Sequence, residues 1–421
     1  MYKKNVLKNG LRIVTFPMEN TRALTLLVLV GAGSRYEKKE LSGISHVLEH
    51  MAFRGTKKRP KSLDISRELD KIGGVYNAFT GKEIMGFWVK VDSKHLDLSC
   101  DIISDMIFHS LFKEKELEKE KKTILEEFNM YLDTPQAYIL DLWEKVLYGD
   151  QPMGWLTIGE KEVIKKINHK DIINYFRSQF RAKNSVVVLA GDFQEKETIK
   201  KLTKYFGKFP NSKTPAKRLT IEKQKSPQVL LQQKETDQAH LAFGVRAFNI
   251  FSAKRHTLAV LANILGGNMS SRLFTEVREK RGMAYYVRTM AEGYTDVGYL
   301  ATHAGIDNKR VEEALKIILK EYKKLTEKKV PQDELKKAKE NLKGHLFLGL
   351  ETSDAWAVYY GGQEILKSAI DTPEKECQMI DKVTQNDILK VAREIFRSDK
   401  LNLALIGPFK DKDKFQKLLK L

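Results

Sequence analysis

The sequence predicts an α+β protein made of two related halves, each with its own strands and helices. The main observation is an internal repeat, because residues 171–193 align without a gap with residues 387–409, at an offset of 216. In both copies a helical pattern is followed by an apolar strand pattern. Eight of the 23 aligned positions are identical, several-fold more than the roughly one or two that composition alone would give. The identical positions in the first copy are Asp171, Ile172, Arg177, Phe180, Arg181, Leu189, Gly191 and Phe193.

Chain length and a polar segment support the division into two parts. A chain of 421 residues is too long for one ordinary core and suggests two or three domains. Residues 210–227 are polar and contain three prolines, which is typical of a linker. We therefore predict an N-terminal domain at residues 1–212, a linker at 213–228 and a homologous C-terminal domain at 229–421.

Turn signals and apolar spacing predict the elements of the first half. Asn9-Gly10 lies between two apolar runs, which is a strong hairpin signal. A loop at residues 31–34 leads toward a helix that contains His46. Apolar spacing predicts further strands and helices along this half. The expected strands are 23–30, 75–80, 86–91 and 184–193, and the expected helices are 62–72, 96–109, 114–130 and 168–180.

Composition excludes several classes of protein. The net charge is +19, but the lysines are scattered along helices and mixed with glutamate, so we expect no nucleic-acid binding. No apolar run approaches the roughly 18 residues that span a bilayer, and no signal peptide is evident, so we expect no membrane association. Cys100 and Cys377 belong to no CxxC pair and are expected to be reduced thiols. These features together predict a cytoplasmic protein.

The strongest chemical signal is the stretch His46-Val-Leu-Glu-His50. Two histidines four residues apart project from one face of a helix, where both imidazoles can reach one metal ion. Glu49 lies beside them, close enough to contact a metal-bound water. The pattern H-x-x-E-H is the inverse of the commoner zinc-protease helix H-E-x-x-H. It predicts a zinc site.

A catalytic zinc usually has three protein ligands and one open position. Glu126 and Glu127, on the helix predicted after residue 114, are the candidates for the third ligand, and their spacing does not decide between them. Glu120 lies two turns before Glu127, on nearly the same face. There it is placed to hydrogen-bond a ligand histidine from outside the metal sphere.

The chain resembles the pitrilysin (insulinase) family of zinc peptidases, closest to the mitochondrial processing peptidase branch. The segment His46-Val-Leu-Glu-His-Met-Ala-Phe-Arg-Gly-Thr56 is similar to the inverted zinc motif of that family. Further similar motifs run through nearly the whole chain. They include Asn9-Gly10-Leu11, Asn77-Ala-Phe-Thr80, Ile124-Leu-Glu-Glu127, Asp133-Thr-Pro135, Gly266-Gly-Asn-Met-Ser-Ser-Arg-Leu273 and Val277-Arg-Glu-Lys-Arg-Gly-Met-Ala-Tyr285. The resemblance implies two α/β domains, each a mostly antiparallel sheet packed with helices.

The resemblance also implies roles at the zinc site. His46, His50 and Glu127 match the zinc ligands, with one zinc ion per chain. Glu49 matches the general base for hydrolysis by a zinc-activated water. Glu127 is preferred over its neighbour because the family's third ligand follows another glutamate by seven residues, which Glu120 matches here.

Substrate contacts are implied in both halves. Asn77, Ala78 and Phe79 match an edge strand to which a peptide substrate adds as an extra strand. Arg278 and Tyr285 match an Arg–Tyr pair that contacts substrate near the scissile bond and is expected to assist catalysis. At the offset of the repeat, the three motif positions of the first half fall on Ala262, Leu265 and Gly266. The second half therefore carries no zinc motif.

The implied function is that of a zinc metalloendopeptidase acting on unfolded peptides or small protein segments inside a clamshell chamber. Some relatives are heterodimers that divide the zinc ligands and the Arg–Tyr pair between two subunits. This chain carries both sets, which favours a homodimer, although a related second subunit stays open. The alternative function is a non-catalytic partner subunit of the same fold. An intact metal and base set argues against that alternative.

Overall fold

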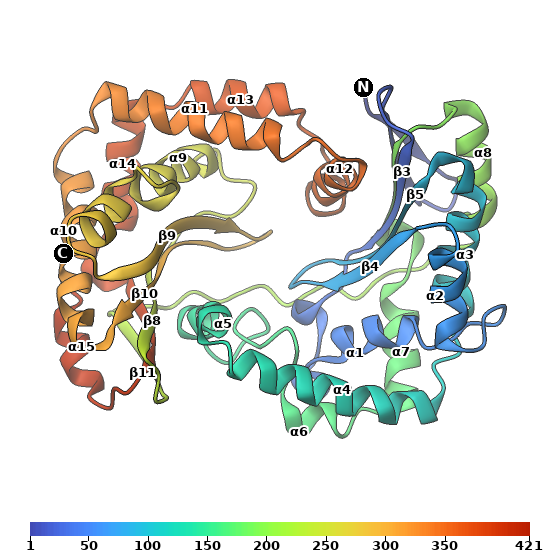
Figure 1. The fold of residues 1–421 in the computed structure, drawn as a ribbon, viewed down its shortest axis with the longest axis horizontal. Helices are drawn as coiled ribbons and strands as arrows, with labels where there is room; N and C mark the ends of the chain where they lie inside the picture. Colours follow the sequence, from blue (N-terminus) through green and yellow to red (C-terminus); the bar gives the residue numbers. More distant parts are fainter. The chain divides into compact units, whose positions relative to one another are not determined.

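The computed structural model describes residues 1–421, which form two compact units (Figure 1). Unit 1 contains residues 1–129, 155–218 and 349–370, and unit 2 contains residues 130–154, 219–348 and 371–421. These units differ from the predicted ranges 1–212 and 229–421 in two segments, 130–154 and 349–370. No helix or strand lies between Phe206 and Gln228, around the predicted linker.

Unit 1 is built on a six-stranded sheet of order β1-β2-β6-β3-β5-β4. Only the β2–β6 pair is parallel, which confirms a mostly antiparallel sheet. The predicted Asn9-Gly10 hairpin joins β1 and β2, where Gly10 has a φ of 88° that favours glycine. The strands are β1 (Lys3–Val6), β2 (Arg12–Pro17), β3 (Ala23–Val30), β4 (Val75–Thr80), β5 (Met85–Asp92) and β6 (Ser185–Gly191).

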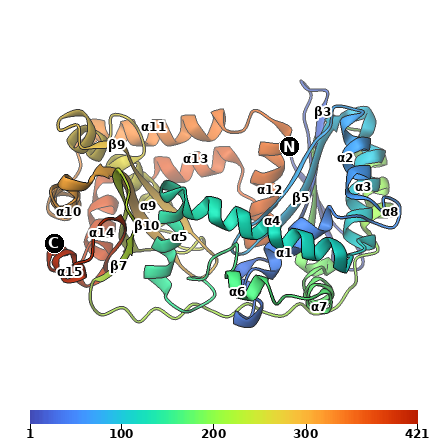
Figure 2. The same ribbon diagram turned by 60° about the horizontal axis from the view of Figure 1, so that its bottom comes forward.

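Helices cover both faces of this sheet, which explains why seven of the eight residues of β3 are buried. One face carries the larger apolar cluster, to which most of the helices contribute. The helices that unit 1 takes from the chain before residue 207 are α1 (Ile44–Ala52), α2 (Ser62–Asp70), α3 (Leu96–His109), α4 (Glu114–Leu132), α6 (Lys161–Ile164), α7 (His169–Gln179) and α8 (Glu195–Phe206). The opposite face packs against a single helix from late in the chain, α12 (Ser353–Lys367) (Figure 2).

Unit 2 repeats this plan with a five-stranded sheet of order β7-β11-β8-β10-β9, in which only β7 and β11 are parallel. The strands are β7 (Gln228–Gln233), β8 (Gln238–Arg246), β9 (Ala284–Gly293), β10 (Gly298–Asp307) and β11 (Leu401–Gly407). The helices on one face and around it are α9 (Arg255–Gly266), α10 (Val311–Glu327), α11 (Gln332–Leu348), α13 (Pro373–Asp381), α14 (Gln385–Ile395) and α15 (Lys412–Leu418). The opposite face packs against α5 (Pro135–Tyr148), from the first half of the chain.

The repeat read from the sequence has the same local structure in both copies. Asp171 and Asp387 each complete a capping box, at the starts of α7 and α14. Phe180 and Phe396 end these helices with nearly equal dihedral angles, φ −82° and ψ 81° against φ −85° and ψ 81°. Each helix then leads into a fully buried strand, β6 or β11. The prediction of two related α/β halves is confirmed.

The packing of α12 gives a testable expectation for stability. Tyr360 is 3% exposed, and its ring lies 5.1 to 5.2 Å from the rings of Tyr2, Phe16 and Trp356. Truncation to alanine would leave a cavity between α12 and the sheet. We expect Tyr360→Ala to lower the free energy of unfolding by about 3–5 kcal/mol in chemical denaturation.

Val358 is the matched control on the same helix, because it is 48% exposed. Val358→Ala is expected to change the free energy of unfolding by no more than about 0.5 kcal/mol. Equal effects of the two substitutions would contradict the assignment of α12 to the core of unit 1.

None of the helices combines the length and the apolar character that crossing a membrane requires.

Candidate metal centre

The short helix α1 presents the two histidines and the glutamate of the H-x-x-E-H motif. Its buried face is mainly apolar and packs into the core of unit 1, and this leaves the other face for the motif. The imidazole centroids of His46 and His50 are 4.7 Å apart with an interplanar angle of 69°. Glu49, which lies between the two histidines in the sequence, is half-buried. The expected one-turn spacing of the histidines is therefore present.

Helix α4 brings a carboxylate to this pair. Glu127 Oε2 lies 3.6 Å from His46 Nε2 and 3.5 Å from His50 Nε2, and one ligand atom from each of the three residues lies within 4.8 Å of the others. Glu126 is exposed and is not a member of this cluster. The geometry thus distinguishes the two glutamates that spacing alone left open.

The donor set fits a zinc ion. Zinc in proteins binds imidazole nitrogen and carboxylate oxygen at roughly 2.0–2.2 Å, in tetrahedral geometry. Two ligands of such a tetrahedron are about 3.4 Å apart, close to the 3.5 and 3.6 Å that separate Glu127 from the two imidazoles. Three protein donors also leave one position open, as catalytic zinc sites do.

Glu120 lies where the sequence predicted, next to a ligand histidine. Its Oε2 accepts a hydrogen bond from His50 Nδ1 at 3.1 Å, so that Nε2 of the same ring faces Glu127. A terminal nitrogen of Arg54 donates a hydrogen bond to Oε2 of Glu120 at 2.9 Å, and Arg54 Nε lies 2.8 Å from Oε1 of the same carboxylate as an ion pair. The sequence analysis missed Arg54. Its position four residues after His50, one helical turn onward, was the available signal.

The electrostatics of the site differ between the two histidines. Burial lowers the pKa of His46 to about 4, and the neighbouring His50 adds to this effect. Burial also acts on His50, but hydrogen bonds to Glu120 and Glu127 outweigh it and raise the pKa of His50 to about 9. At neutral pH His46 is therefore neutral and His50 is protonated in the metal-free pair, and a metal ion bound at Nε2 of His50 would displace the extra proton.

Burial and the contacts with the histidines also shift the pKa values of the three glutamates at the site. Burial raises the pKa of Glu49, which keeps it a better proton acceptor than an exposed glutamate. The hydrogen bond with His50 lowers the pKa of Glu127. For Glu120, burial is outweighed by His50 and Arg54, which lower its pKa.

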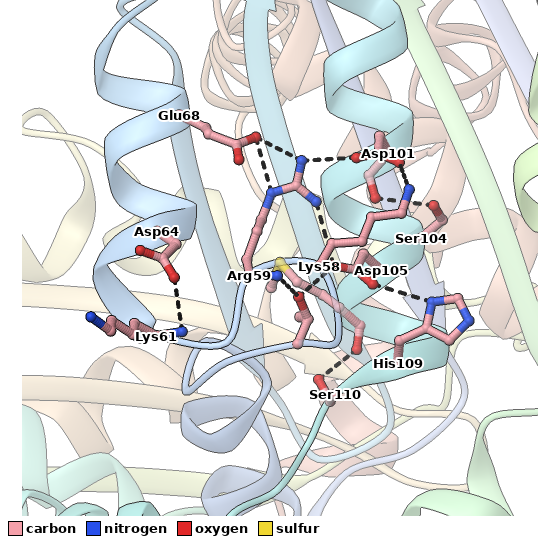
Figure 3. Close-up of polar contacts among 12 residues, drawn as sticks. Lys58, Arg59, Lys61, Asp64, Glu68, Asp101, Ser104, Asp105, His109 and Ser110 are labelled. Atoms are coloured by element: carbon pink, nitrogen blue, oxygen red, sulfur yellow. Dashed lines mark hydrogen bonds and ion pairs between the residues drawn. The ribbon is translucent and has the colours of Figure 1, made fainter.

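A buried charge network fixes the segment that follows α1 (Figure 3). Arg59 is 5% exposed and reaches Glu68 at 2.6 Å and Asp101 at 2.8 Å. The hydroxyl of Thr56 donates to Asp105 and accepts the backbone N–H of Arg59 at 3.0 Å. The segment that follows the motif helix is therefore tied to α2 and α3.

The predicted substrate strand lies at a sheet edge, because β4 pairs only with β5. Gly81 N–H closes the β4–β5 hairpin on Ile84 O at 2.8 Å, and hydrogen-bonded pairs alternate from there. Asn77 and Phe79 consequently face β5 with their backbone groups, whereas Ala78 directs its groups toward the open edge. In the structure the Ala78 N–H donates a hydrogen bond to the side-chain oxygen of Asn77 at 2.8 Å.

The predicted Arg–Tyr pair lies in unit 2. Arg278 belongs to the π-helical segment Phe274–Glu279, and Tyr285 is the second residue of the edge strand β9. The guanidinium carbon of Arg278 lies 5.6 Å from the ring centroid of Tyr285 and 4.9 Å from that of Phe274. Tyr285 is 74% exposed, so most of its surface is open to solvent.

Comparison with known proteins identifies the family of the chain. The family described as "Insulinase (Peptidase family M16)" matches residues 12–161, and the one described as "Peptidase M16 inactive domain" matches residues 166–342. A Bacillus subtilis protein named an uncharacterized zinc protease is 34% identical over 409 residues, covering 97% of this chain and 98% of that protein. A Streptomyces coelicolor protein with the same kind of name is 33% identical, covering 97% of this chain and 90% of its own.

Solved structures share the fold. A protease from Helicobacter pylori superposes with a TM-score of 0.91 at 26% identity, covering 97% of this chain and 99% of that one. A peptidase M16 inactive domain from Pseudomonas fluorescens has a TM-score of 0.89 at 17% identity, covering 97% and 98% of the two chains, which shows the fold alone. The two family matches together account for well over half of the sequence. The chain therefore belongs to peptidase family M16, the insulinase family.

Proposed function

We propose that this chain is a zinc-dependent endopeptidase that binds one zinc ion and hydrolyses unfolded peptides or small protein segments. The observation that carries the proposal is the convergence of His46, His50 and Glu127 within 4.8 Å, with Glu49 on the same short helix. A protein with only a scaffolding role would have no use for a metal site with an adjacent base. The zinc protease names of relatives that match nearly the whole chain add support.

In this mechanism the metal ligands are His46, His50 and Glu127. Zinc, when bound there, supplies Lewis-acid polarisation of the scissile carbonyl and of the attacking water. Glu49 takes the proton of that water and later gives it to the leaving amine. Its raised pKa suits both roles, because a base with a pKa nearer to neutral pH also returns the proton readily.

Glu120 orients the site from outside the metal ligands. Its hydrogen bond to His50 Nδ1 fixes the ring so that Nε2 is directed to the metal position. One hydrogen bond and a second ion-pair contact from Arg54 hold that carboxylate in place and keep it ionised.

We assign peptide binding to the edge strand β4 and to the pair formed by Arg278 and Tyr285. An extended peptide can add to the free edge of β4, where the backbone groups of Ala78 face outward. Backbone pairing of this kind requires an unfolded segment but little particular sequence. In unit 2, the Arg278 guanidinium and the Tyr285 hydroxyl are hydrogen-bond donors for a peptide substrate.

We also propose a homodimer, because a single chain carries both the metal set and the Arg–Tyr pair. Sedimentation of the purified chain tests this directly. A monomer that becomes active only with a second, related chain would replace the homodimer by a heterodimer.

The function is tested with metal analysis and a pool of quenched peptides of random sequence. We expect about one zinc per chain and cleavage that a chelator abolishes and added zinc restores. Zinc-free protein without cleavage would favour the non-catalytic partner subunit instead. Zinc-loaded protein without cleavage of any unfolded peptide would contradict the endopeptidase assignment.

A further inference from the structure

The N-terminus of the metal helix α1 has no capping side chain of its own. Its N-cap residue is Gly43, in the left-handed region with φ 93°, and its first turn contains no acidic residue. A side chain at this position has no room, because a Cβ on Gly43 would lie 2.7 Å from Ile158 O and 2.9 Å from Gly159 Cα. The free N–H groups of the first turn must therefore find acceptors elsewhere.

Glu37 supplies these acceptors from the preceding loop. Its Oε2 accepts the N–H of Gly43 at 2.7 Å, and its Oε1 accepts the N–H of Ser45 at 2.8 Å. The residue is 6% exposed, so a carboxylate has been buried at the positive end of the helix. Both oxygens are occupied by backbone groups of α1.

A second contact ties the same turn to α7. The hydroxyl of Ser45 lies 2.7 Å from the hydroxyl of Tyr175, which also reaches the backbone of Gly33 at 3.4 Å. Burial raises the pKa of Glu37 to about 7, while the hydrogen bonds from Ser45 and Gly43 oppose that effect. The N–H groups of this turn are therefore bound by the buried side chain of Glu37, whose desolvation is unfavourable, and not by water.

We propose that Glu37 is a positioning residue of the metal centre: by binding the N–H groups of Gly43 and Ser45 it fixes the first turn of α1 and with it His46. The inference rests on the proposed zinc function. It assigns to Glu37 a role at the N-terminal end of α1, whereas the Arg59 network holds the segment that follows the helix.

The place of His46 in α1 explains why this cap matters for the metal and not only for stability. The helix has nine residues and begins at Ile44, so His46 lies within its first turn, directly after Ser45. First turns of short helices fray when their N–H groups have no acceptors. Fraying would move His46 away from Glu127 and leave His50, one turn later, in place.

The test compares wild type with Glu37→Gln, which keeps the size of the side chain but offers one acceptor oxygen in place of two. Zinc affinity of the metal-free protein is measured by competition with a chelator of known affinity. We expect a loss of about 10–100-fold, as for other residues that orient metal ligands. The visible spectrum of the cobalt-loaded protein should change in shape. With saturating zinc, kcat should fall while KM stays within about twofold.

Asp387→Asn is the matched control, because Asp387 accepts the backbone N–H of Thr384 at 2.9 Å at the start of α14 in unit 2. We expect it to lower thermal stability and leave zinc affinity within about twofold of wild type. If E37Q binds zinc as tightly as wild type, the inference is overturned and the proposed function is not affected. Wild-type protein that takes up no zinc would overturn the proposed function and the inference with it.

If E37Q does not fold, the positioning role of Glu37 is tested with Glu37→Asp instead. Aspartate keeps the charge but is one methylene shorter, so it cannot reach both N–H groups. We expect its zinc affinity to fall between the wild-type value and the E37Q range. An affinity equal to wild type would overturn the positioning role.

Discussion

Glu49→Gln is expected to lower kcat for peptide cleavage by about 10²–10⁴-fold, the usual contribution of a positioned general base. Glutamine has nearly the same size but cannot accept the proton of the attacking water. Zinc content should stay at the wild-type value, because Glu49 is not among the three residues whose ligand atoms converge. The measurement is kcat on a quenched peptide alongside zinc content by atomic spectroscopy.

Two results would contradict this role of Glu49. Cleavage near the wild-type rate would show that another group takes the proton. Loss of zinc together with activity would show that Glu49 binds the metal or supports its ligands, in which case the loss of rate says nothing about proton transfer.

Glu127→Gln is expected to weaken zinc binding by more than the roughly 100-fold that loss of an outer hydrogen-bond partner costs. The substitution removes the only carboxylate among the three converging residues and leaves two neutral donors from α1. Cleavage should fall in proportion to the zinc lost. Zinc affinity is again read by competition with a chelator.

Glu126→Gln is the matched control, on the same helix and one residue away. Because Glu126 is exposed and outside the cluster, we expect zinc affinity and kcat within about twofold of wild type. The reverse outcome, with Glu126 required and Glu127 dispensable, would contradict the side-chain arrangement of α4.

Much of the fold was predictable because the local signals agree with the final structure. The Asn9-Gly10 hairpin and the strand at 23–30 appear at the expected positions. The repeat at offset 216 predicted two related halves, and its two copies end their helices with the same dihedral angles. Periodicity and turn residues act over a few positions, so they are readable from the chain alone.

The division into compact units was not predictable in the same way. Each sheet has two apolar faces, and the second face is covered by a helix from the other half of the chain, α12 or α5. An amphipathic helix shows that it has a partner surface but not which one. The predicted ranges 1–212 and 229–421 therefore differ from the observed units in these two segments.

The same contrast holds at the metal centre. The sequence by itself determined that His46 and His50 share one helix face with Glu49 beside them, because helical spacing alone requires it. Spacing left Glu126 and Glu127 open, and the family resemblance favoured Glu127. The tertiary structure brings Glu127 to the histidines, since neighbouring residues on a helix point about 100° apart and the packing of α4 selects one. It also decided that Arg54 holds Glu120 and that Glu37 caps α1. Those contacts join residues that no local pattern relates, and only the folded chain brings them within hydrogen-bonding distance.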